Sequence, residues 1–296
     1  MDINQKISRK SFIKAGTFAL MTPFLPKLDF DVKASSKIGL QLYTLRDAIS
    51  KDLEGTLKKV SEIGYKEVET FGYNDGKFFG KTPKEFKSLL AKYGLNPVSG
   101  HYGAGIENKN QKGTLSNDWE RAVNDAAELG QKYVVCAYLT GNERKSIEDY
   151  KKYVDLFNKA GETAEKAGLQ FAYHNHDFEF IKLDGELPYD YIAGKTDSKL
   201  VKLELDLFWI VKAGLDPVEL FKQYPGRFPL WHVKDMEKGG DHSFAEVGTG
   251  SIDFKKIFEA RKIAGMTNFF VEQDVAKNPV FEAIATSYKN IIGMKV

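Results

Sequence analysis

The stretch KYVVCAYLTGNERKSIEDYKKYVDLFNKAGETAEKAGLQFAYHNH, residues 132–176, contains one complete structural unit of this chain. It begins with a run of β-branched and aromatic residues (132–139), which is typical of a buried strand. A longer segment with helical spacing of its apolar residues follows (146–168). A second strand-like run (169–176) starts directly after that segment. A strand, a helix and a strand in this order predict two parallel strands joined by a right-handed crossover.

The same unit recurs along the chain after residue 37. Eight strand-like runs are expected, at 38–43, 66–72, 96–103, 132–139, 169–176, 199–208, 229–235 and 268–274. Helical segments are expected at 53–64, 82–94, 118–130, 146–168, 216–226, 253–265 and 278–293, and a long polar loop is expected after the fifth strand. Eight such units within 296 residues match an α/β fold, the closed (β/α)8 TIM barrel, as a single domain. Neither GxGxxG nor GxxxxGK[ST] follows the first strand, which argues against a nucleotide-binding fold.

Glycine and proline mark the ends of these helical segments. Glycine adopts the left-handed conformation after a helix at little cost, and proline fits the first helical turn. Thr-Pro, Asp-Pro and Asn-Pro pairs open three of the segments. Glycine ends five of them: Gly64, Gly94, Gly130, Gly168 and Gly265.

The composition excludes several classes of protein. With 42% hydrophobic and 28% charged residues the chain is globular, and its net charge of +2 comes from interleaved acids and bases. No basic run offers a surface for phosphates, so no nucleic-acid partner is expected. Cys136 is the single cysteine, which excludes a disulfide framework and a cysteine zinc cluster. Burial as a small apolar side chain is expected for it rather than nucleophilic reactivity.

The N-terminus differs from the rest of the chain. Ser8–Lys14 (SRKSFIK) precedes a short apolar stretch, which is the form of an export signal. It resembles a twin-arginine signal with Lys10 in place of the second arginine; an amphipathic arm is the alternative. Gly16 and Pro23 interrupt the apolar run, so stable membrane insertion is not expected. We therefore expect a signal and linker over 1–36, a barrel over 37–296 and a periplasmic location, with the cytoplasm as the alternative.

Reactive side chains cluster at the expected carboxyl ends of the strands, where barrels of this class place their active sites. Strand parity puts His174 and His176 on one face, and Glu204 and Asp206 on one face. Polar groups on buried strands need a reason, since burial without a partner is costly. The clustered residues are Glu69, His101, His174, His176, Glu204, Asp206, His232 and Glu272.

Asp206, His232 and Glu272 at equivalent strand ends predict a metal site. Imidazole and carboxylate together favour one divalent ion, with Mn²⁺, Zn²⁺, Co²⁺ or Fe²⁺ preferred over Mg²⁺ or Ca²⁺. A single strand histidine is more often a hydrogen-bonded core residue, which is the simpler interpretation of His101 or His176 taken alone. Glu204 is a candidate acceptor that holds a histidine tautomer.

Seven motifs in order make the chain resemble the xylose isomerase-like TIM-barrel family, over roughly residues 37–294. This is the sugar phosphate isomerase/epimerase group, which also includes inosose dehydratases, hydroxypyruvate isomerases, ketose 3-epimerases and endonuclease-IV-type enzymes. The motifs are IGLQLYTLRD, GYKEVETFG, VSGHYG, LELDLFW, WHVKD, EVGTGSIDF and FFVEQD. No DNA-binding surface accompanies them.

The resemblance implies a metal site built by strands five to eight. The family uses glutamate, aspartate, histidine and glutamate there, and the last three match Asp206, His232 and Glu272. His174 occupies the position of the first glutamate, which keeps a metal ligand but removes one of the two facing bases of an epimerase. A histidine there is similar to the inosose dehydratase-like branch.

The resemblance also implies proton abstraction beside a carbonyl of a sugar or polyol, through a metal-stabilised enediolate. Isomerisation or epimerisation is expected; dehydration or hydration of a 3-keto sugar or inosose is the alternative, and an inactive carbohydrate-binding barrel is the alternative outside enzymes. Glu272 is the expected base or ligand, His176 an acid or base, and Lys234 an electrostatic or acid partner. Substrate contacts are expected from Gln41, Tyr43, Arg46, Glu69, His101, Glu204 and Trp209. An exported enzyme suits keto-sugars better than phosphorylated metabolites, and the sequence is compatible with a homo-oligomer.

Overall fold

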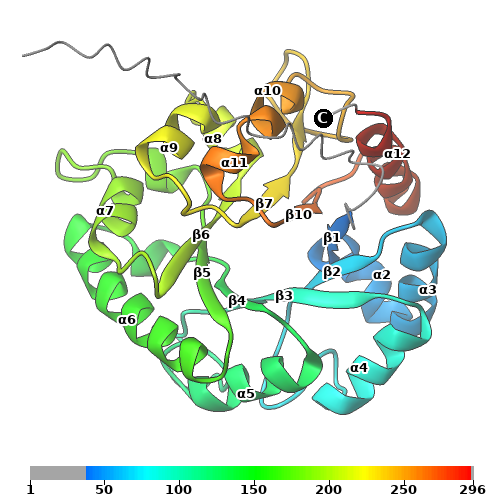
Figure 1. Ribbon diagram of the computed structural model, residues 1–296, viewed down its shortest axis with the longest axis horizontal. Helices are drawn as coiled ribbons and strands as arrows, with labels where there is room; N and C mark the ends of the chain where they lie inside the picture. Colours follow the sequence, from blue (N-terminus) through cyan, green and yellow to red (C-terminus); the bar gives the residue numbers. More distant parts are fainter. Residues whose placement is uncertain (1–37, 295–296) are drawn as a thin grey trace, which may run out of the picture.

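The computed structural model describes residues 38–294 and has the expected barrel (Figure 1). Eight parallel strands close in the order β1-β10-β7-β6-β5-β4-β3-β2. Their bounds are β1 Gly39–Gln41, β2 Glu67–Thr70, β3 Asn96–Tyr102, β4 Tyr133–Cys136, β5 Gln170–His174, β6 Val201–Asp206, β7 Leu230–Val233 and β10 Asn268–Val271. The single-domain (β/α)8 prediction is therefore confirmed.

Helices surround the strands as the alternating pattern predicts (Figure 1). They are α3 Leu53–Ile63, α4 Pro83–Lys92, α5 Trp119–Leu129, α6 Ile147–Lys166, α9 Pro217–Gln223 and α12 Val280–Gly293. Thr82 opens α4 with a capping box and Pro83 occupies its first turn. Gly130 ends α5 at a φ of 105°, where a residue with a Cβ would be strained.

Several elements differ from the sequence-based expectation. The segment after the fifth strand is not only a polar loop, because it contains a 3-10 turn, η3 (Phe178–Phe180), and the helix α7 (Pro188–Lys195). The sixth strand ends at Asp206, whose side chain caps the helix α8 (Leu207–Lys212). The fifth strand is shorter than expected, because β5 ends at His174 and His176 follows the strand instead of closing it. Further differences are short elements: η1 Leu42–Leu45, α2 Arg46–Lys51, η2 Gly141–Glu143, the hairpin of β8 Asp235–Met236 and β9 Phe244–Ala245, and a helix divided into α10 Phe254–Glu259 and α11 Arg261–Ala264.

The barrel has a small apolar layer inside and a large apolar layer outside. The inner layer consists of Val98, Val135, Ala172, Leu230 and Phe270, whereas Leu203 and Leu205 belong to the layer that packs against the helices. Each of three inner residues lies two positions before a polar one, in the pairs Ala172/His174, Leu230/His232 and Phe270/Glu272, where Glu272 directly follows β10. The polar cluster therefore lies directly above the apolar floor, on the carboxyl side of the strands.

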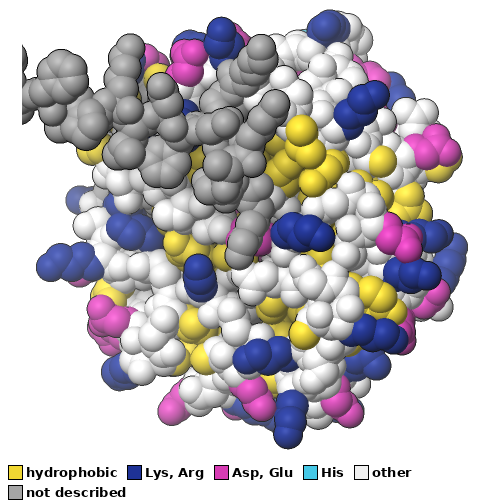
Figure 2. All heavy atoms as spheres, turned by 45° about the vertical axis from the view of Figure 1, so that its right-hand side comes forward, with side chains coloured by type: hydrophobic (Ala, Val, Ile, Leu, Met, Phe, Trp, Pro, Cys, Tyr) yellow, Lys and Arg dark blue, Asp and Glu magenta, His cyan; other side chains and the backbone are white. Residues whose placement is uncertain are grey.

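Basic and acidic side chains are interspersed over the face that Figure 2 shows. Among residues 38–294, no helix has the length and apolar character that a membrane crossing requires. The predicted export signal and its linker, 1–36, lie outside the described residues, so the periplasmic location stays a prediction.

Candidate active site

Two groups of potential metal ligands meet inside the barrel mouth and share one histidine. Each group brings its donor atoms within 4.8 Å of one another. His232 from β7 belongs to both, because its Nδ1 faces one group and its Nε2 faces the other. The first group is His174, Asp206, His232 and Glu272, and the second is Glu69, His101, Glu204 and His232.

The first group is the set of ligands expected from the sequence. His174 Nε2 lies 3.1 Å from His232 Nδ1 and 3.3 Å from Asp206 Oδ2. His232 Nδ1 lies 2.7 Å from Glu272 Oε2 and 3.9 Å from Asp206 Oδ2. Around a tetrahedral ion with bonds near 2.1 Å, neighbouring donor atoms are about 3.4 Å apart, so the observed spacings fit a small divalent ion.

Two further features of the first group fit a cation. Asp206 Oδ2 and Glu272 Oε2 are buried and accept no aligned hydrogen bond from the described residues, although the Lys234 ammonium lies 2.9 Å and 2.7 Å from them. The other oxygen of Asp206, Oδ1, accepts hydrogen bonds from Phe208 N (2.9 Å) and Trp209 N (3.1 Å). Capping α8 thus fixes the carboxylate and leaves Oδ2 turned to the other donors. His174 Nδ1 lies 3.2 Å from Ala137 O, which fixes its ring in the same way.

The second group is a tightly bonded network rather than an open cage. His232 Nε2 lies 2.5 Å from Glu69 Oε2, and His101 Nε2 lies 2.7 Å from Glu204 Oε2. Burial alone raises the pKa of both carboxyls, but His101 and His232 lower the pKa of Glu69 to about 2. For Glu204, burial and the nearby Glu69 charge raise the pKa to about 7. The network therefore holds charge on the Glu69 side, where it orients His232.

Lys234 is the cation beside the first group. Its Nζ lies 2.7 Å from Glu272 Oε2, 2.9 Å from Asp206 Oδ2 and 2.9 Å from Asp274 Oδ2. Burial disfavours the ammonium, but Asp206, Asp274 and Glu272 together raise the pKa of Lys234 well above its ordinary value. Burial would raise the pKa of Glu272, whereas Lys234 and His232 hold it well below the usual range. Glu272 is therefore a carboxylate, which suits a ligand better than a strong base.

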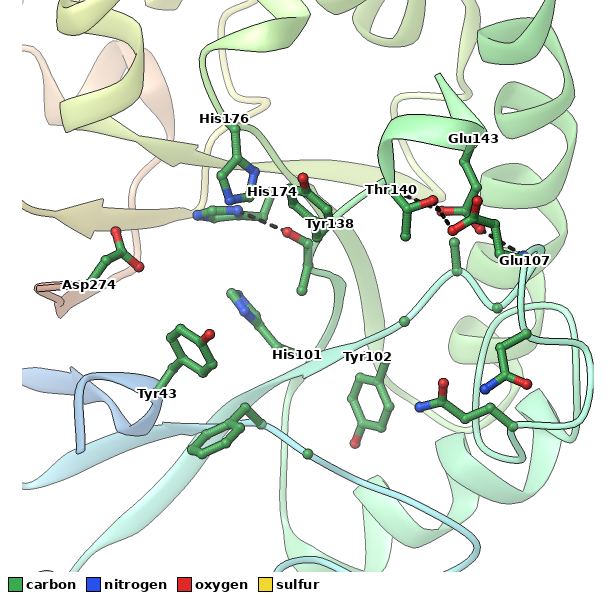
Figure 3. A pocket seen from close by; sticks show the side chains of 18 of the residues that line it. Tyr43, His101, Tyr102, Glu107, Tyr138, Thr140, Glu143, His174, His176 and Asp274 are labelled. Atoms are coloured by element: carbon green, nitrogen blue, oxygen red, sulfur yellow. Dashed lines mark hydrogen bonds between the residues drawn. The ribbon is translucent and has the colours of Figure 1, made fainter. Parts of the chain in front are cut away.

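A cavity of about 610 Å³ opens beside this cluster, and Figure 3 shows the side chains around it. His174, His176, Lys234 and Glu272 form its inner wall. Burial and the Lys234 charge lower the pKa of His176 to about 3, so this imidazole is neutral at neutral pH. Its Nδ1 has no hydrogen-bond partner among the described residues.

The structure separates the expected substrate contacts into two sets. Tyr43 and His101 line the cavity, whereas Gln41, Arg46, Glu69, Glu204 and Trp209 do not. Gln41 donates to Glu69 Oε2 (2.7 Å) and belongs to the network beneath the cluster. Arg46 donates to Asp274 O (2.9 Å) and lies over the Tyr43 ring at 4.6 Å. The Trp209 ring lies 5.7 Å from the His176 ring and does not line the cavity.

Sequence reasoning did not include several residues of this wall. Asp274 is expected on the same face of the run 268–274 as Glu272 but is not among the predicted site residues; it follows β10, and its Oδ2 lies 2.9 Å from Lys234 Nζ. Tyr138, Glu107, Thr140 and Glu143 stand in the loops after β3 and β4, where no periodicity indicates side-chain direction. Asp235 accepts hydrogen bonds from the backbone of the VGTGSI loop and fixes it, but it does not line the cavity.

The fold and the cluster define a class: a (β/α)8 barrel whose strand ends carry histidines and carboxylates around a cavity. Residues 57–280 match the model of the xylose isomerase-like TIM-barrel family. The chain belongs to this family, as the resemblance in its motifs indicated.

Known relatives cover a part or most of the chain. An inosose dehydratase from Lacticaseibacillus casei is 29% identical over 46% of this chain and 51% of its own length, so the chain spans about half the length of such curated relatives. The crystal structure of a sugar phosphate isomerase/epimerase from Parabacteroides distasonis superposes with a TM-score of 0.74 at 29% identity, covering 88% of this chain and 95% of that one. The IolI protein, whose structure contains a zinc atom, superposes with a TM-score of 0.68 at 19% identity over 87% of this chain and 97% of its own, which shows the shared fold.

Proposed function

We propose that this chain is a divalent-metal-dependent enzyme that removes a proton next to a carbonyl group of a sugar or polyol derivative. The observation that carries the proposal is the meeting of four ligand atoms, from His174, Asp206, His232 and Glu272, of which His174 and Glu272 line the cavity. The names of the relatives agree with sugar and inosose chemistry. Mn²⁺, Zn²⁺, Co²⁺ or Fe²⁺ suits the mixed imidazole and carboxylate donors.

The roles of the residues follow from their charge states. The ion, when bound, would act as a Lewis acid that polarises the substrate carbonyl. His176 lines the cavity and has a ring nitrogen without a partner among the described residues, so it is the proposed group that takes and returns the proton. Lys234 stays protonated between three carboxylates and is the proposed stabiliser of negative charge. Tyr43 and His101 line the cavity and are proposed to contact the substrate.

Two outcomes of this proton abstraction are proposed. Isomerisation or epimerisation returns the proton to carbon, whereas dehydration expels a neighbouring hydroxyl group. The presence of His174 where the family places a glutamate favours dehydration of a keto-sugar or inosose, because it removes one carboxylate of a facing pair. The inosose dehydratase relatives support the same candidate.

Metal analysis tests the common part of the proposal. The wild type is expected to retain about one divalent ion per chain after dialysis, and a double variant, Asp206→Ala with His232→Ala, is expected to retain none. A wild type that holds no ion when Mn²⁺, Zn²⁺, Co²⁺ and Fe²⁺ are each supplied would contradict the proposal.

Proton exchange in D₂O distinguishes the outcomes. Inosose, 3-keto-glucose and common ketoses are incubated with the metal-loaded enzyme and followed by NMR. Deuterium in the returned sugar indicates isomerisation or epimerisation, and an unsaturated product indicates dehydration. A metal-loaded protein that binds these sugars without exchange or product would instead be the carbohydrate-binding barrel.

A further inference from the structure

The cavity is larger than one sugar ring requires. Water occupies about 30 Å³ per molecule, so a six-carbon sugar with twelve non-hydrogen atoms fills at most roughly 360 Å³. The cavity measures about 610 Å³ and continues outward from the donor cluster. A monosaccharide bound at His174 and Glu272 would leave a large part of this space unused.

The outer part of the cavity has a wall that is already built. Glu143 accepts hydrogen bonds from Glu107 N (3.1 Å) and Thr140 N (2.8 Å), and Thr140 Oγ1 donates to Glu107 Oε2 (2.5 Å). The two bonds of Glu107 tie the loop after β3 to the loop after β4. Figure 3 shows the tied residues at the opposite side of the view from Asp274 and Tyr43. Asn108 and Gln111 add amide groups to this wall.

The charge of the cavity wall argues against a phosphate group. Lys234 is the one lysine or arginine among the described residues that line the cavity, and it is paired with three carboxylates. The outer part contains Glu107 and Glu143 instead. Arg144 donates to Tyr138 Oη (3.4 Å) from outside the cavity lining. A phosphate placed in the outer part would lose its hydration and meet two carboxylates, with no cation on the cavity wall itself.

Two tyrosines at the cavity are suited to sugar rings. Tyr43 and Tyr138 both line it, yet 41% and 43% of their surfaces remain exposed. Edge contacts hold each ring in place, with Tyr43 5.3 Å from Phe71 and Tyr138 4.9 Å from His176. Aromatic rings that are held in place and partly exposed offer apolar contact area together with a hydroxyl group.

From these features we infer that the outer part of the cavity is a second subsite, which binds an uncharged glycosyl group. The substrate is then a neutral two-ring glycoside whose reacting ring lies at the donor cluster and whose second ring lies between Tyr138 and the wall of Glu107, Asn108 and Thr140. This inference rests on the proposed function, because that function places the reacting ring.

Calorimetric titration of the Mn²⁺-supplied wild-type protein tests the subsite. The probes are glucose, glucose 6-phosphate, and three disaccharides of different linkage: cellobiose, maltose and trehalose. At least one disaccharide is expected to bind about tenfold or more tightly than glucose, and glucose 6-phosphate more weakly than glucose. Equal binding of glucose and every disaccharide, tightest binding of the phosphate, or no binding of any probe would overturn the inference.

A matched pair of variants locates the binding site. Asn108→Trp fills the outer subsite and is expected to lower the affinity for the preferred disaccharide about tenfold. Asn110→Trp adds the same bulk two residues away, at an exposed position that does not line the cavity. It is expected to leave the affinity for the preferred disaccharide unchanged. Equal effects of the two variants would count against the subsite. Metal content and proton exchange are measured separately, so the proposed function can fail while the subsite stands, or the reverse.

Discussion

His232 Nε2 lies 2.5 Å from Glu69 Oε2, so a carboxylate on β2 holds an imidazole on β7 across the barrel. The bond directs the other ring nitrogen, Nδ1, toward Glu272, at 2.7 Å. A histidine that is fixed through its second nitrogen presents a defined lone pair to a metal.

Glu69→Gln is expected to weaken metal binding by about 10- to 100-fold, because an amide holds the His232 ring less firmly than a carboxylate does. Competition with a chromogenic chelator measures the affinity. Glu67→Gln is the control, since Glu67 stands on the same strand but bonds Asn268 at the amino end of the barrel. An equal loss in both variants would show that strand stability, rather than the orientation of His232, determines the affinity.

Strand parity explains which parts of this arrangement the sequence could predict. Alternation placed His174, Asp206, His232 and Glu272 on inward faces, and closure of the barrel then brought them together. The same alternation in LELDLF predicted strand through Leu207 and Phe208, but Asp206 caps α8 there. Capping depends on backbone geometry that a two-residue period does not describe. Thr140 and Glu143 lie in a loop, so their place in the cavity wall depends on hydrogen bonds between loops.

His174→Glu is expected to retain the metal and to change its preference. The substitution replaces an imidazole donor with the carboxylate that the family places there, and oxygen ligands favour Mn²⁺ and Mg²⁺ over Zn²⁺. The ratio of Mn²⁺ to Zn²⁺ affinity should rise by about tenfold or more. His174→Ala serves for comparison, and it should bind both ions more weakly. An unchanged ratio in His174→Glu would exclude residue 174 as a ligand.

Lys234→Met is expected to make the stability of the fold depend on metal. Without the ammonium, the carboxylates of Asp206, Glu272 and Asp274 face one another with no neutralising charge. In the presence of a chelator this should lower the free energy of unfolding by on the order of 3–5 kcal/mol. A divalent ion should restore most of this loss, and its affinity should rise because a neighbouring positive charge is gone. Thermal unfolding with EDTA and with Mn²⁺ measures both effects.

The control for Lys234→Met is Lys256→Met. Lys256 pairs with Asp216 at 2.6 Å, but the two side chains are 55% and 35% exposed. Lys256→Met should therefore change the free energy of unfolding by less than about 1 kcal/mol, both with EDTA and with Mn²⁺. If metal does not reduce the destabilisation in Lys234→Met, the carboxylates of the first group do not share an ion.

Glu179 is expected to make unfolding depend on pH. Its side chain is fully buried and accepts a hydrogen bond from His176 N (2.8 Å), and burial raises its pKa from 4.5 to about 7. Because the folded pKa exceeds the unfolded one, the stability from the protonated form is complete below about pH 4.5 and is lost as the pH rises through about 7. Glu179→Gln removes this linkage, so its stability relative to the wild type should rise by about 3 kcal/mol between pH 4.5 and pH 8. Urea unfolding across this range measures the difference, and parallel curves would show that Glu179 has no raised pKa.

Two glycine-to-alanine changes should act in opposite directions on stability. In α6, a Cβ on Gly161 would lie 2.6 Å from Leu200 O, so Gly161→Ala forces the helix away from the segment before β6 and should cost about 1–3 kcal/mol. In α7, a Cβ on Gly194 would meet nothing within 4 Å, and Gly194→Ala should stabilise by about 0.4–1 kcal/mol because it restricts the unfolded chain. Urea unfolding midpoints compare the two. If both changes stabilised the protein, α6 would be free to move relative to Leu200. The close approach at Gly161 would then not fix the position of the strand β6, which begins after Leu200 and ends at Asp206.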